Sequence, residues 1–129
     1  MTRKLLHSLL PLVFLYLLLS RPAQATEPVG RWRGSWTSLS SGHRGPLRAR
    51  VRPIDANTYR ALFAGRFAGV VPFVYPSTLQ RVPGSSARFQ TSTRLPLLGE
   101  YRMTAYVSNH RFFARYSSKR DQGVFDLSR

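Results

Sequence analysis

Hydrophobic and polar residues alternate along most of this chain, and short groups of turn residues separate the alternating stretches. A period of two places successive side chains on opposite faces of a β-strand, whereas an amphipathic helix repeats apolar residues every three or four positions. The helical spacing is not sustained anywhere after the first 25 residues. The alternation predicts eight strands: Arg31–Ser38, Leu47–Arg52, Thr58–Phe67, Val70–Val82, Arg88–Leu95, Glu100–Val107, Arg111–Ser117 and Val124–Arg129.

The stretch Val70–Val82 is the least regular of the eight. It contains Pro72 and Pro76, and a proline cannot donate a hydrogen bond to a neighbouring strand. We therefore predict an edge strand, a bulged strand or a broken strand at this point of the chain.

Short strands with one polar face, joined by short connections, are typical of an antiparallel meander. Eight such strands either close into a small up-and-down barrel or form a two-sheet sandwich. We favour the barrel, because closure removes the exposed strand edges that an open sheet would present. The predicted fold is all-β, with a single domain over residues 26–129.

The first 25 residues have the three parts of a secretory signal peptide. Met1–Lys4 is basic, Leu5–Ser20 is mostly apolar, and Ala23–Ala25 is a small-x-small cleavage pattern. The apolar run is shorter than the roughly 20 residues of a spanning helix, which favours cleavage over a retained anchor. We predict an N-terminal signal helix, a cut after Ala25 and a secreted or periplasmic protein.

The two ends of the predicted domain carry a recognisable combination. Gly30-Arg31-Trp32 and Gly34-Ser35-Trp36 are both Gly-x-Trp on the first strand, and the chain ends in Arg129. In this combination the chain resembles the calycin superfamily of lipocalins, avidins and related barrels, although it has no cysteine for the disulfide common in lipocalins. The resemblance implies that Trp32 or Trp36 closes one end of the barrel and that Arg129 packs over the indole as a cation–π contact.

Aromatic residues occupy one face of the predicted strands and small residues lie between them. In a closed barrel this face is the lumen, and small side chains there would leave room for a small apolar or aromatic ligand. The alternative is a completely packed core. The candidate lumen residues are Trp36, Tyr59, Phe63, Phe89, Tyr101, Phe112 and Tyr116.

The opposite face is basic. The chain has 20 Lys and Arg residues against five Asp and Glu, a formal net charge of +15. Like charges on neighbouring strands repel one another, so this face suits an anionic partner such as an envelope polymer or a phospholipid headgroup. The alternative is a solvated face that only keeps the protein soluble, and export argues against intracellular nucleic acid. The candidate anion-binding residues are Arg31, Arg33, Arg48, Arg50, Arg52, Arg60 and Arg66.

The sequence offers little for catalysis or for metal binding. No two of the five acidic residues share a predicted site for acid–base chemistry, cysteine is absent, and His43 and His110 lie in separate loops. We predict a non-enzymatic binding protein without cofactor or metal. A third interpretation is an inhibitor that inserts the loop Thr37–Pro46 into a secreted enzyme. The oligomeric state stays open.

Overall fold

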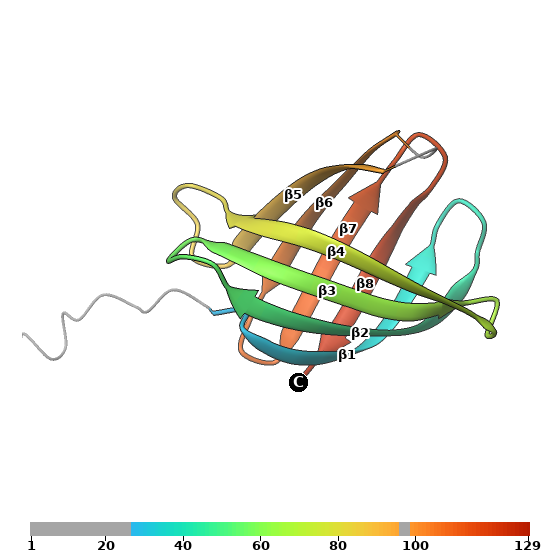
Figure 1. The fold of residues 1–129 in the computed structure, drawn as a ribbon, viewed down its shortest axis with the longest axis horizontal. Coiled ribbons are helices and arrows are strands. Elements are labelled where there is room, and N and C mark those ends of the chain that lie inside the picture. The colour runs from blue at the N-terminus through green and yellow to red at the C-terminus, as the bar shows by residue number, and fades with distance from the viewer. Residues whose placement is uncertain (1–26, 96–98) are drawn as a thin grey trace, which may run out of the picture.

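A computed structural model describes residues 27–95 and 99–129, and within these residues the protein is a closed barrel of eight antiparallel strands (Figure 1). The predicted barrel is confirmed, and the sandwich alternative is not formed. The predicted signal helix and its cleavage site lie outside the described residues. The strands are β1 (Gly30–Ser38), β2 (Arg44–Pro53), β3 (Thr58–Phe67), β4 (Val71–Arg81), β5 (Arg88–Leu95), β6 (Gly99–Val107), β7 (Arg111–Ser117) and β8 (Gln122–Ser128).

Each strand pairs with its neighbours in the sequence, and β1 closes the barrel by pairing with β8. Trp36 of β1 lies opposite Phe125 of β8 and opposite Gly45 of β2. Close approach at the closing seam needs a glycine, because a Cβ atom at Gly34 would collide with the backbone oxygen of Asp126. The second Gly-x-Trp motif therefore has a packing role of its own in joining the first strand to the last.

The proline-containing strand β4 is continuous and unbulged along β3, from Thr58 opposite Gln80 to Phe67 opposite Val71. Its pairing with β5 is limited to Gln80 with Gln90 and Arg81 with Phe89. The Arg81 amide donates to the Asn57 carbonyl on the β3 side. Because backbone groups alternate in direction along a strand, the nitrogens of Pro72 and Pro76 point to the β5 side. Most of β4 is thus an edge along this seam, which accommodates both prolines.

The bounds of several strands differ from the predicted ones by one or two residues, and the largest difference is the start of β2, which begins at Arg44 rather than at Leu47. Arg44-Gly45-Pro46 has no alternating apolar residue, so the hydrophobic pattern does not reveal the strand. Gly45 pairs with Trp36, and a Cβ atom there would lie 2.5 Å from the Arg66 oxygen. Backbone approach, rather than side-chain burial, determines the residue at this position.

The inward face of every strand contributes to one hydrophobic core that includes Trp32, Phe63, Phe89 and Phe112. Outward residues are exposed or partly exposed, so over most of each strand the two faces separate as the alternation predicts. In the part of the chain that the structure describes, no helix is long and apolar enough to cross a membrane.

Candidate functional site

The candidate lumen residues meet inside the barrel. Six of them are buried (Trp36, Tyr59, Phe63, Phe89, Phe112 and Tyr116), while Tyr101 is partly buried. The ring of Phe63 lies 5.1 Å from that of Phe125 and 6.0 Å from that of Phe112, between centroids. These contacts join β3 to β7 and β8 across the barrel. At this level, side chains occupy the centre of the lumen.

The end of the barrel that contains Trp32, here called the Trp32 end, is closed by the segment Glu27–Val29 and by Arg129. The guanidinium carbon of Arg129 lies 4.1 Å from the centroid of the Trp32 ring. Arg129 donates hydrogen bonds to the backbone oxygens of Val29, Glu27 and Asn109, and the Trp32 indole donates to the Pro28 oxygen at 2.8 Å. The expected cation–π contact of Arg129 is thus made with Trp32 and not with Trp36.

A second arginine at the Trp32 end, Arg81, was not among the candidate residues. Its guanidinium carbon lies 4.7 Å from the centroid of the Phe89 ring. It donates to the Tyr59 hydroxyl at 2.9 Å and pairs with Glu27 at 3.6 Å. The Arg81 side chain is only 9% exposed. The signal for it was available in the alternation of β4, since Arg81 has the same parity as the buried Leu79.

The opposite end of the barrel, here called the Trp36 end, contains a group of tyrosines. The rings of Tyr101 and Tyr116 stack with centroids 5.3 Å apart. The Tyr116 hydroxyl donates to Asp121, and the Ser38 hydroxyl donates to the other oxygen of the same carboxylate. Burial raises the pKa of Tyr101 and that of Tyr116, and the nearby Asp121 carboxylate acts in the same direction on both. Both tyrosines are therefore neutral hydrogen-bonding groups near neutral pH.

The loop considered for inhibition is short. Thr37 and Ser38 belong to β1, and Arg44–Pro46 belong to β2. The remaining residues form a turn in which the Ser38 amide donates to the His43 oxygen at 2.7 Å and the Gly42 amide donates to the Ser38 oxygen at 3.0 Å. The connection is a tight hairpin tied to its own strands.

The seven candidate arginines lie together on the outer face of β1, β2 and β3, and all seven are exposed. The strand register places Arg31 opposite Arg50, Arg33 opposite Arg48 and Arg52 opposite Arg60. The ion pairs recorded within the described residues involve Arg81, Arg102 and Arg111 instead. Three pairs of positive charges therefore lie directly opposite one another, and no ion pair within the described residues includes any of these arginines.

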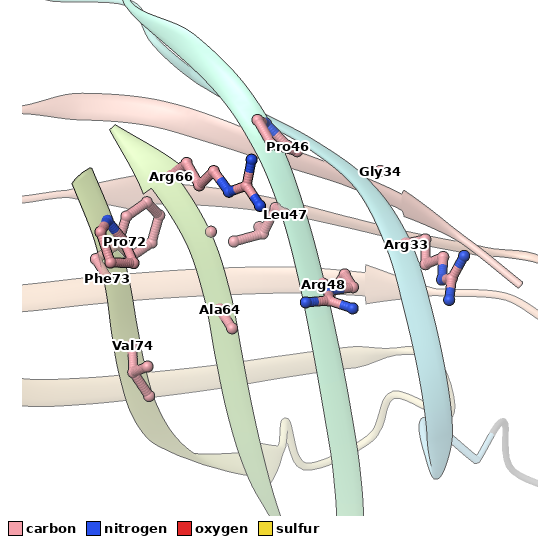
Figure 2. Close-up of a pocket in the computed structure, with 11 residues that line it drawn as sticks. Arg33, Gly34, Pro46, Leu47, Arg48, Ala64, Arg66, Pro72, Phe73 and Val74 are labelled. Carbon is pink, nitrogen blue, oxygen red and sulfur yellow. The ribbon is translucent and has the colours of Figure 1, made fainter. Parts of the chain in front are cut away.

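A groove of about 630 Å³ crosses this face (Figure 2). Arg33, Arg48 and Arg66 line it from β1, β2 and β3, and Ala64, Pro72 and Val74 add apolar surface from β3 and β4. A smaller groove of about 270 Å³ adjoins it and shares Arg33, Arg48 and Ala64. Alternation along each strand predicts that these arginines point outward. The groove could not be predicted in this way, because residues of four different strands, β1 to β4, form it together.

The arginines that line these grooves have the chemistry to bind oxyanions. A guanidinium group presents a planar set of donors that matches the oxygens of phosphate and sulfate. Several such groups in a row suit a partner with repeated negative charges. No protein-family model matches this chain, and no curated protein matches it significantly.

Proposed function

We propose that this protein is a non-enzymatic, exported binding protein that attaches to phosphate-bearing envelope material through the outer arginine face of β1–β3. One observation carries the proposal: three cross-strand arginine pairs lie on one exposed face, and none of these arginines forms an ion pair within the part of the chain that the structure describes. Like charges directly opposite one another destabilise a sheet. A face that keeps three such pairs is well suited to an anionic ligand, whose charges would relieve the repulsion.

The interior of the barrel also favours the outer arginine face, rather than the lumen, as the binding surface. Ring contacts across the lumen, such as that between Phe63 and Phe125, give the aromatic residues a structural role. The Trp32 end, with Arg129 over the indole, supports a calycin-type barrel as the scaffold. In this proposal the barrel is the support, and the arginine face is the binding surface.

Retention on immobilised heparin tests the proposal, because heparin is a polyanion without a lipid part and presents repeated sulfate groups. The triple glutamine variant, Arg33→Gln, Arg48→Gln and Arg50→Gln, removes three charges from the face and keeps a polar, hydrogen-bonding side chain at each position. The matched control removes the same number of charges elsewhere through Arg88→Gln, Arg115→Gln and Lys119→Gln, three exposed residues of β5, β7 and the turn after β7.

We expect the wild type and the matched control to elute at a similar, high salt concentration, since electrostatic binding weakens as salt screens the charges. The triple glutamine variant should elute much earlier. If it eluted together with the matched control, net charge alone would account for retention and the arginine face would have no special role.

A further inference from the structure

The outer face of β1–β4 is divided between charge and apolar surface. Next to the arginines, the outward positions of β3 and β4 include Leu62, Ala64, Val74 and the prolines of β4. Leu62 is 45% exposed and Val74 is 64% exposed. Ala64 lies opposite both Arg48 and Val74, so the apolar strip directly adjoins the arginines. Figure 2 shows Val74 and Ala64 beside Arg48 on neighbouring strands.

The hairpin between β3 and β4 adds further exposed apolar residues at the end of this strip, although Phe67 and Val71 have the inward parity of core residues. Arg66 and Pro72, which line the groove, are paired, and one pair further on, after Phe67 with Val71, the strands are joined by the turn at residues 68–70. Ala68 and Gly69 adopt positive φ values of 54° and 75°, which makes the turn tight. At the turn, Phe67, Val70 and Val71 are all exposed, Val70 to 78%. In Figure 1 this hairpin lies at the right-hand tip of β3 and β4.

The composition of the face discriminates between possible partners. A second copy of the chain would set arginines against arginines, which is unfavourable. A soluble polyanion would satisfy the arginines and leave Val70, Val71 and Val74 in water. The surface of a bilayer offers both phosphate groups and, a few ångströms deeper, the boundary of the acyl chains. Of these three partners, the bilayer is the one that matches both halves of the face.

We propose that the outer face of β1–β4 docks on the surface of a bilayer that contains anionic phospholipids. The β3–β4 hairpin enters the boundary between headgroups and acyl chains through Val70 and Val71, while Arg33, Arg48 and Arg50 contact the lipid phosphates. This inference rests on the proposed anion binding, because the same arginines serve both, and it adds the lipid source and the apolar contact.

Vesicle sedimentation and heparin retention together test it. Vesicles of phosphatidylcholine with phosphatidylglycerol should bind the wild-type chain, and vesicles of phosphatidylcholine alone should not, because arginines near an anionic surface each contribute about a fivefold gain in affinity. The double variant Val70→Ser, Val71→Ser should bind the anionic vesicles about tenfold more weakly and should elute from heparin as the wild type does. The triple glutamine variant should lose both activities.

Ile54→Ser is the matched control for the hairpin. Ile54 is also an exposed aliphatic residue, but it lies in the turn between β2 and β3, at the Trp32 end of the barrel. Ile54→Ser should bind vesicles like the wild type. All variants keep the same N-terminus, so any contribution of that segment to vesicle binding is the same in every sample.

The absence of cysteine from the sequence allows a direct measurement of depth. A single cysteine, Val70→Cys or Ile54→Cys, can be labelled with an environment-sensitive fluorophore. On anionic vesicles we expect a blue shift from position 70 and none from position 54.

The outcomes distinguish a failure of the bilayer inference from a failure of the proposed anion binding. Unchanged vesicle binding by the double serine variant, or no spectral shift at position 70, would overturn the bilayer inference. If heparin retention still depended on the arginine face, the partner would be a soluble polyanion and the proposed function would stand. Equal retention of the triple glutamine variant and its matched control would overturn the proposed function as well.

Discussion

Replacing Phe63 by alanine tests whether the lumen is a packed core or a ligand cavity. Phe63 is completely buried, and its ring contacts those of Tyr75, Phe112 and Phe125 at centroid distances of 5.9, 6.0 and 5.1 Å. Truncation of a buried phenylalanine costs about 3–5 kcal/mol when the surroundings cannot collapse. The neighbouring rings are attached to three different strands, which hinders collapse, so we expect about 4 kcal/mol.

That loss is large for a small domain, whose total free energy of unfolding is about 5–15 kcal/mol. Urea unfolding followed by the fluorescence of the two buried tryptophans would measure it. Phe113→Ala is the matched control. Phe113 follows Phe112 on β7 and faces outward, and the guanidinium carbon of Arg111 lies 4.9 Å from the centroid of its ring. We expect the control to cost about 1 kcal/mol or less. A loss below about 1 kcal/mol for Phe63→Ala would refute the packed lumen.

Three further predictions follow from the barrel ends and the arginine face. Arg129→Gln removes the guanidinium over the indole and should lower the free energy of unfolding by about 1–3 kcal/mol in urea. Burial raises the pKa of Tyr101 and that of Tyr116 in the folded state. As the pH rises, the unfolded chain therefore loses these protons before the folded protein does, so stability should be retained below about pH 10 and fall above it. Thermal unfolding at increasing pH would detect this fall, and the variant Tyr116→Phe should show a smaller one. The triple glutamine variant should be more stable than the wild type at low salt, by a difference that added salt removes.

The strands were predictable because burial on one face imposes a period of two, as in Thr58–Phe67, whose predicted bounds are those of β3. Where burial does not dictate the residue, the pattern gave no information. Arg44-Gly45-Pro46 joins β2 through backbone approach to Trp36 and Arg66. The up-and-down barrel implies that the first strand meets the last, but the register of that seam depends on pairs far apart in the chain, such as Trp36 with Phe125, and alternation within one strand contains no signal for it.

For the candidate site, the sequence predicted which face each arginine occupies but not its immediate neighbours. Parity places Arg33 and Arg48 outward, whereas their position directly opposite each other depends on the register of β1 and β2. The β3–β4 hairpin shows the same limit. Phe67 and Val71 have the parity of core residues, yet both are exposed, since the two strands extend to a turn at which the barrel no longer covers them.

The arginine face and the aromatic core impose different requirements on the same strands. Each alternate residue of β2 is needed by the core, as Leu47 and Val51 are, while the residues between them, Arg48 and Arg50, oppose other arginines and do not help the sheet to form. Selection for stability alone would favour neutral or paired residues at those positions. Because the core supplies the burial that the fold needs, the outer face is free to keep a charge pattern that costs stability. The requirements of the barrel do not explain this pattern, which is why we propose a ligand that supplies the missing negative charge.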